Sequence, residues 1–182
     1  MSAVTDFSDE DRERLYELTS IGASHASLAF TRLLDRAIAP SAPQFRETDA
    51  YLADDSWSTG VIFQADGELS GLVAILLPAA TCDMVAERLI RGEQRDDPAE
   101  AIESALRELG NIGASHTLSA IADRLGGRIM LSVPVLVMKD VGTAFASMIR
   151  EYGAKRCVEC DLTDVTRDIC VRLVIVPGSK PT

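Results

Sequence analysis

Residues 17–25 read ELTSIGASH and residues 108–116 read ELGNIGASH, so seven of nine positions are identical at an offset of 91 residues. The offset is half the length of the 182-residue chain. An internal repeat at a fixed distance indicates an architecture made of repeated units. We therefore predict one domain over residues 1–182, built from two similar halves at about residues 9–91 and 98–177.

Each copy of the repeat lies in a long segment with helical periodicity. These segments cover residues 9–37 and 98–126 and contain no internal proline. Ser8 precedes three acidic residues, so it can cap the first helix while the acids complement the helix dipole. Two shorter helices are predicted at residues 79–91 and 141–152.

After each long helix the sequence takes on the alternation of strands. Three strands are predicted in each half, at residues 44–52, 59–65 and 68–77 and at residues 128–139, 154–162 and 168–176. The Asp66-Gly67 pair favours a tight hairpin turn between two of them. The predicted fold is α+β, with two long helices on one face of a six-stranded, largely antiparallel sheet and pseudo-two-fold symmetry.

Composition argues against several classes of function. A net charge of -10 repels phosphate backbones and anionic lipids, so we expect neither nucleic acid nor a membrane as partner. The acidic N-terminal stretch does not resemble a secretory signal, and no apolar run approaches the roughly 20 residues that span a bilayer. We expect a soluble, cytoplasmic protein whose four cysteines are free thiols.

The 18 basic residues comprise 15 Arg and only three Lys. Together with the excess of Asp and Glu, this skew indicates a halophile-like acidic protein from a salty cytoplasm. A high-GC genome that favours Arg codons is the alternative explanation.

Glu108 and Asn111 form the candidate functional site. Residues three apart share a helix face, so the two present a carboxylate and an amide side by side. Glu17 and Ser20 occupy the corresponding positions in the first copy. Helix stability does not explain the choice of residues, because Asn is a weak helix former and Gly113 costs roughly 1 kcal/mol relative to Ala.

The spacing Ser104-x-x-x-Glu108-x-x-Asn111, followed by Ile112-Gly113, resembles the signature of the CheC, CheX and FliY phosphatases of chemotaxis. The resemblance covers nearly the whole chain, since the fold of that family also has two long helices against a six-stranded sheet. It implies hydrolysis of the phosphoaspartate of a CheY-like response regulator, with Asn111 orienting water and Glu108 pairing with a lysine of the receiver. It also implies no cofactor or metal in this chain, because Mg2+ and the phosphorylated Asp belong to the receiver.

The chemistry agrees with that implication. A phosphoaspartate is an activated acyl phosphate, so its hydrolysis mainly requires a water held in line with phosphorus. A neutral amide can accept a hydrogen bond from the water and donate one to a phosphoryl oxygen. Ser20 offers only a shorter hydroxyl, so Glu17 and Ser20 are expected to form a weak or silent second site.

Two other functions fit the same resemblance. The chain could be a non-catalytic or weakly catalytic adaptor that binds phosphorylated CheY and the receptor deamidase CheD. A flagellar-switch component like FliY is disfavoured, because the extra switch-binding domain of that family is not expected here. A monomer is expected, since two similar halves supply the symmetry that CheX-type proteins obtain by dimerising.

Two further patterns are expected to be structural. His25 and His116 hold matched positions, but two ligands do not complete a tetrahedral metal site, so helix packing with a polar contact is favoured. Cys157 and Cys160 lie three apart in a predicted strand and should point to opposite faces, which argues against zinc or redox chemistry. The Gly-Ala-Ser run of each repeat is expected to allow close helix packing or to leave room for a partner loop.

Overall fold

The computed structural model describes residues 7–91 and 96–178. The helices in these ranges are α1 (Asp9–Leu34), η1 (Thr48–Tyr51, a 3-10 turn), α2 (Ala79–Ile90), α3 (Pro98–Leu125) and α4 (Val141–Glu151). The strands are β1 (Ile38–Pro40), β2 (Gln44–Glu47), β3 (Thr59–Gly67), β4 (Gly71–Leu77), β5 (Ile129–Leu131), β6 (Val135–Val137), β7 (Arg156–Asp164) and β8 (Cys170–Pro177). The α+β class and all four predicted helices are confirmed.

All strands belong to one antiparallel sheet with the order β1-β7-β8-β4-β3-β5, in which β2 also pairs with β7 and β6 also pairs with β3. The sheet is thus six strands wide, because β1 and β2 share one edge and β5 and β6 share the other. A two-fold relation between the halves would exchange β1/β2 with β5/β6, β3 with β7, and β4 with β8. After this exchange the strand order is the same, read from the other edge of the sheet. The predicted pseudo-two-fold symmetry requires such an order.

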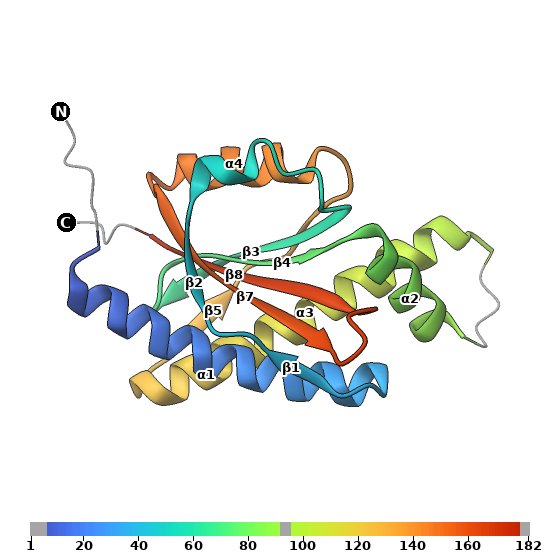
Figure 1. Cartoon of the computed structure of the whole chain (residues 1–182), viewed down its shortest axis with the longest axis horizontal. Helices are drawn as coiled ribbons and strands as arrows, with labels where there is room; N and C mark the ends of the chain where they lie inside the picture. Colours follow the sequence, from blue (N-terminus) through green and yellow to red (C-terminus); the bar gives the residue numbers. More distant parts are fainter. Residues whose placement is uncertain (1–6, 92–95, 179–182) are drawn as a thin grey trace.

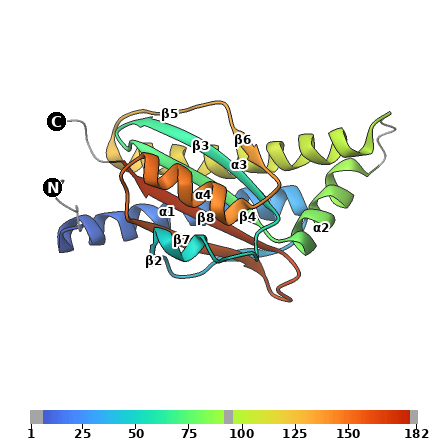
Figure 2. The same ribbon diagram turned by 90° about the horizontal axis from the view of Figure 1, so that it is seen from above.

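The sheet is covered on both faces. Figure 1 shows α1 and α3 side by side beneath it and α4 above it, with α2 at one end against α3. Figure 2, seen from above, has α4 lying over the sheet and the two long helices behind it. β4 is buried along its whole length, because its alternate residues enter two separate apolar clusters. The predicted placement of the two long helices on one face is confirmed.

Each edge of the sheet holds two short strands instead of one long strand. Pro43 and Pro134 stand in the two interruptions, and proline cannot donate a ladder hydrogen bond. The strand predicted at residues 44–52 is confirmed only over Gln44–Glu47, and the single strand predicted at residues 128–139 is wrong. The first ends where η1 begins, and the second divides into β5 and β6.

The predicted hairpin between β3 and β4 is confirmed, but its turn does not lie at Asp66-Gly67. β3 continues through both residues, which pair with Met130 and Ile129 of β5. The chain turns between Gly67 and Gly71, whose φ values of 131° and 145° are readily reached only by glycine. Pairing with β5 thus keeps Asp66 and Gly67 in β3, although their sequence favours a turn.

The ends of the long helices follow local chemistry. The Ser8 hydroxyl accepts a hydrogen bond from the amide of Asp11 at 3.1 Å, which confirms the predicted cap of α1. Asp97 caps α3 by accepting from the amide of Ala99 at 2.9 Å. α1 stops at Leu34, before its predicted end, because Asp35 adopts a left-handed conformation with φ of 51°.

Glycines let the long helices approach their neighbours. A Cβ atom on Gly22 would lie 2.7 Å from Cγ2 of Thr117 on α3, so the predicted close packing of the two helices is confirmed. A Cβ atom on Gly110 would lie 2.5 Å from Cγ1 of the buried Val61 on β3. Glycine therefore sets the distance between α3 and the sheet directly beside Asn111.

We expect Gly110→Val to lower the free energy of unfolding by about 2–3 kcal/mol, because the added atoms overlap a buried, stiff β-branched side chain. The measurement is a denaturant titration followed by circular dichroism. Ser115→Val is the matched control, since it adds the same side chain at an exposed position of the same helix. Equal stability of the two variants would contradict the expected overlap.

Candidate functional site

The predicted site lies in the middle of an unbroken helix. Glu108 and Asn111 are exposed on the outer face of α3, whereas Leu109 and Gly110 between them are buried toward the sheet. One turn of helix thus presents a carboxylate and an amide to solvent while its other face anchors the backbone. The structure brings these two residues together as the helical spacing predicted.

Neither side chain makes a hydrogen bond or an ion pair with any residue in ranges 7–91 and 96–178. Both groups are therefore available to an outside partner. Three cavities of about 370, 400 and 350 Å³ in the described part of the chain are lined by other residues than Glu108 and Asn111. A site on an exposed helix face suits a macromolecular partner better than a small substrate, which is normally bound in a cleft.

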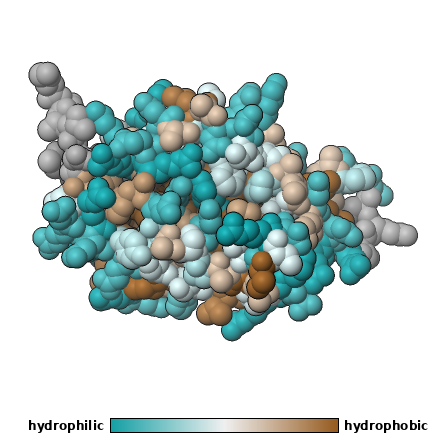
Figure 3. Space-filling model, in the orientation of Figure 1, coloured by the Kyte–Doolittle hydropathy of each residue, from teal (hydrophilic) through white to brown (hydrophobic). Residues whose placement is uncertain are grey.

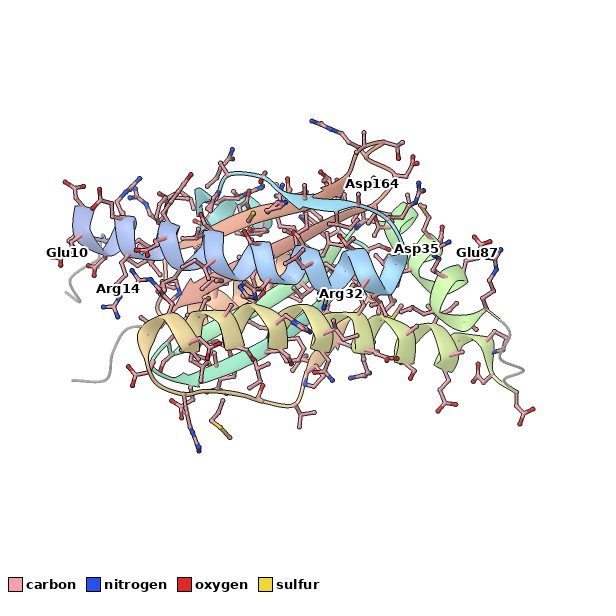
Figure 4. All side chains as sticks on the ribbon, turned by 90° about the horizontal axis from the view of Figure 1, so that it is seen from below. Glu10, Arg14, Arg32, Asp35, Glu87 and Asp164 are labelled. Carbon is pink, nitrogen blue, oxygen red and sulfur yellow. The ribbon has the colours of Figure 1, made fainter. Side chains whose placement is uncertain are left out.

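α1 and α3 run antiparallel across this face, as Figure 4 shows from below. Their register follows from contacts near both ends: Glu17 with Arg124, and Gly113 with Phe30. The first-copy residues therefore lie far from the second-copy site. Glu108 and Arg124 are separated by about 24 Å along α3 at a rise of about 1.5 Å per residue.

Glu17 and Ser20 share a face of α1 as predicted, but their surroundings differ from those of the second copy. Arg124 donates from Nε and Nη2 to Oε1 of Glu17 at 2.9 and 2.7 Å. Ser20 is half-buried, and its carbonyl accepts from the hydroxyl of Ser24 at 2.9 Å. Sequence reasoning missed Arg124, because no local pattern links it to a residue on the other helix.

The two histidines are exposed and form no hydrogen bond within the described part of the chain. The polar packing contact predicted for His25 and His116 is therefore wrong, because the repeat places both on the outer face. No group of three or more potential metal ligands occurs among the described residues.

Cys157 and Cys160 point to opposite faces of β7, as predicted. Cys157 belongs to the cluster beneath α4, and Cys160 to the cluster beneath α1 and α3. Burial raises the pKa of the Cys157 thiol to about 12, so the thiol stays protonated at neutral pH. The two sulfurs cannot share one metal ion from opposite faces of the strand.

The sequence also gave no sign of a buried ionic cluster on the α4 face of the sheet. Glu159, only 7% exposed, lies between Arg46 and Arg172 at 3.3 and 3.2 Å and accepts a hydrogen bond from the hydroxyl of Tyr51. Because the sheet separates these residues from the outer face of α3, we assign them to stability and not to the site.

The surface in the view of Figure 3 is mostly hydrophilic, with scattered small apolar areas. Within ranges 7–91 and 96–178 no helix has the length and apolar character needed to cross a bilayer.

Comparison with known proteins shows similarity to one family. Residues 102–138 match the model of the CheC-like family. The CheY-P phosphatase CheC of Bacillus subtilis (strain 168) is 29% identical over 163 residues, which cover 84% of this chain and 78% of that protein.

Solved structures share the fold. FliY of Thermotoga maritima superposes with a TM-score of 0.68 at 15% identity, covering 93% of this chain and 91% of that chain. A chain of the CheX-CheY-BeF3-Mg2+ complex from Borrelia burgdorferi gives 0.62 at 19% identity, covering 87% and 96%. The segment that matches the CheC-like family model contains Glu108 and Asn111, and the similarity to the Bacillus relative and to the solved folds extends over most of the chain.

Proposed function

We propose that the chain hydrolyses the phosphoaspartate of a phosphorylated CheY-like response regulator. The observation that carries the proposal is the pair Glu108 and Asn111, exposed side by side on α3 without a partner among the described residues. A relative at 29% identity is a CheY-P phosphatase, and the family match spans both residues.

Each side chain has a separate task in this proposal. Asn111 accepts a hydrogen bond from the attacking water and donates one to a phosphoryl oxygen, which holds the water in line with phosphorus. Glu108 pairs with a lysine beside the phosphorylated aspartate and thereby docks the receiver. The Mg2+ that neutralises phosphoryl charge belongs to the receiver, so this chain supplies position and not a nucleophile.

The exposure of Glu108 and Asn111 is compatible with such a reaction. A receiver carries its phosphoryl group in its own active site, and side chains on an exposed helix face can reach that group. Gly110 and Gly113 hold α3 close to β3 and to Phe30, so the helix that carries the site is firmly seated on the core. A firmly seated helix loses little conformational entropy when it docks.

The direct test follows the decay of a receiver phosphorylated by a small phosphodonor, with Mg2+ present and donor removed, in the presence and absence of this chain. We expect catalytic amounts of the chain to speed the decay at least tenfold. The assay is run at low and high salt, because an acidic chain can require salt for full stability. Unchanged decay at both salt levels would contradict the proposal.

An adaptor that binds phosphorylated CheY and CheD is the second candidate. The ion pair between Glu17 and Arg124 favours it, because this pair leaves one complete site where the repeat allows two. The adaptor predicts binding of the phosphorylated receiver without faster decay. Light scattering of the free chain and of its mixtures with either partner reports the expected monomer and any complex.

A further inference from the structure

Resting on the proposed function, we infer that Arg124 silences the first copy of the site by occupying the docking carboxylate of Glu17. Loss of the amide at Ser20 is then only one of two defects. The inference depends on an ion pair between the helices that exists in one copy and is missing from the other.

The ion pair is specific in geometry. Two nitrogens of the Arg124 guanidinium, Nε and Nη2, donate to the same oxygen of Glu17 at 2.9 and 2.7 Å. Arg124 lies in the last turn of α3, where a cation is also favoured by the helix dipole. The carboxylate that should meet a lysine of the receiver is thus already paired within the chain.

The second copy lacks this cation. The offset of 91 residues that relates Glu17 to Glu108 also relates Leu33 to Arg124. Leu33 is half-buried and packs against the apolar cluster under the long helices. Glu108 has no ion pair with a described residue, so its full negative charge is available to a partner.

The pair matters more for docking than for folding. Its side chains are 57% and 52% exposed, and ion pairs in such positions add little stability because water and salt screen them. A docking receiver must displace the guanidinium from Glu17 and also bring its lysine and Mg2+ close to that positive charge. Competition and like-charge repulsion together are expected to weaken docking at the first copy about tenfold or more.

The first experiment is a rescue in the Asn111→Ala background, where the second copy is inactive. Adding Ser20→Asn alone is expected to restore little phosphatase activity, since Glu17 stays paired. Adding Ser20→Asn together with Arg124→Leu is expected to raise the rate at least tenfold above that variant. Arg124→Leu without Ser20→Asn is the control and stays inactive, because the amide is still missing.

The reciprocal experiment places the cation in the second copy. Leu33→Arg in the otherwise wild-type chain is expected to lower phosphatase activity about tenfold, with the second copy now resembling the first. Leu33→Gln is the matched control, because it removes the same apolar side chain without adding charge. Circular dichroism and the unfolding midpoint of both variants verify that the fold is retained.

Two results would overturn the inference. One is a strong recovery of phosphatase activity by Ser20→Asn while Arg124 is in place. The other is no recovery of activity when Arg124→Leu is added to Ser20→Asn, in a chain whose wild type is active. An inactive wild type contradicts the proposed function, and receiver binding then decides the inference separately. Calorimetry with a receiver activated by beryllofluoride and Mg2+ should count one receiver per wild-type chain and two per Ser20→Asn/Arg124→Leu chain. One receiver on both chains would overturn the role of Arg124.

Discussion

Asn111→Ala is expected to slow hydrolysis of the receiver phosphoaspartate about 100-fold or more, nearly to the rate of the receiver alone. The amide is the group proposed to hold the attacking water in line, and loss of one such positioned hydrogen-bonding group commonly costs about 100- to 1000-fold. Asn111 is exposed and unpaired among the described residues, so its loss leaves the helix intact. The measurement is the single-turnover decay of the phosphorylated receiver.

Measurements of receiver binding separate the water-positioning role of Asn111 from the docking role of Glu108. Asn111→Ala is expected to bind an activated receiver within about threefold of wild type, because Glu108 still provides the ion pair. Glu108→Ala is expected to weaken binding much more strongly. Ser20→Ala is the matched control, since it truncates the corresponding residue of the first copy and should leave the rate unchanged. A full rate in Asn111→Ala would assign the water-positioning role to another residue.

Much of the site could be predicted from sequence because its determinants are local. Three-residue spacing on a helix places Glu108 and Asn111 on one face whatever the rest of the fold does. The buried Leu109 and Gly110 between them follow from the same periodicity. Ser8 and its neighbouring acids likewise marked the start of α1 correctly, because a capping box is formed by residues only three apart.

The features that sequence reasoning predicted wrongly or missed depend on contacts between segments far apart in the sequence. Asp66-Gly67 carries a strong local turn signal, yet pairing with β5, more than 60 residues later, keeps both residues in β3. The ion pair of Glu17 with Arg124 depends on the register of two antiparallel helices, which neither helix encodes alone. Register between distant elements is set by packing, here by Gly22 against Thr117.

The buried ionic cluster of β7 is a further feature of this kind. Tyr51 and Arg46 reach Glu159 from η1 and β2, and Arg172 reaches it from β8. Burial, followed by the nearby Cys157 and Glu159, raises the pKa of Tyr51, so its hydroxyl remains a donor. Glu159 thus joins a segment of the first half to two strands of the second.

We expect Glu159→Ala to lower the free energy of unfolding by about 2–3 kcal/mol. The substitution removes the shared acceptor of Tyr51, Arg46 and Arg172, and the buried Tyr51 hydroxyl then lacks its carboxylate acceptor. Arg46 keeps Asp54 at 3.0 Å and Arg172 keeps Asp161 at 2.7 Å, which places the loss below that of a fully isolated charge. Denaturant unfolding measured by circular dichroism gives the magnitude.

An exposed ion pair on the same side of the sheet provides the control for the buried cluster. Asp49→Ala breaks an ion pair with Arg150 whose side chains are 74% and 52% exposed, and its effect on stability should be small. Trp57, the single tryptophan, lies over the guanidinium of Arg172, so its fluorescence reports whether the cluster loosens before global unfolding. If Glu159→Ala and Asp49→Ala were equally stable, the cluster would contribute no more than a surface pair. Phosphatase activity per folded molecule should be unchanged in both, because the sheet separates the cluster from Glu108 and Asn111.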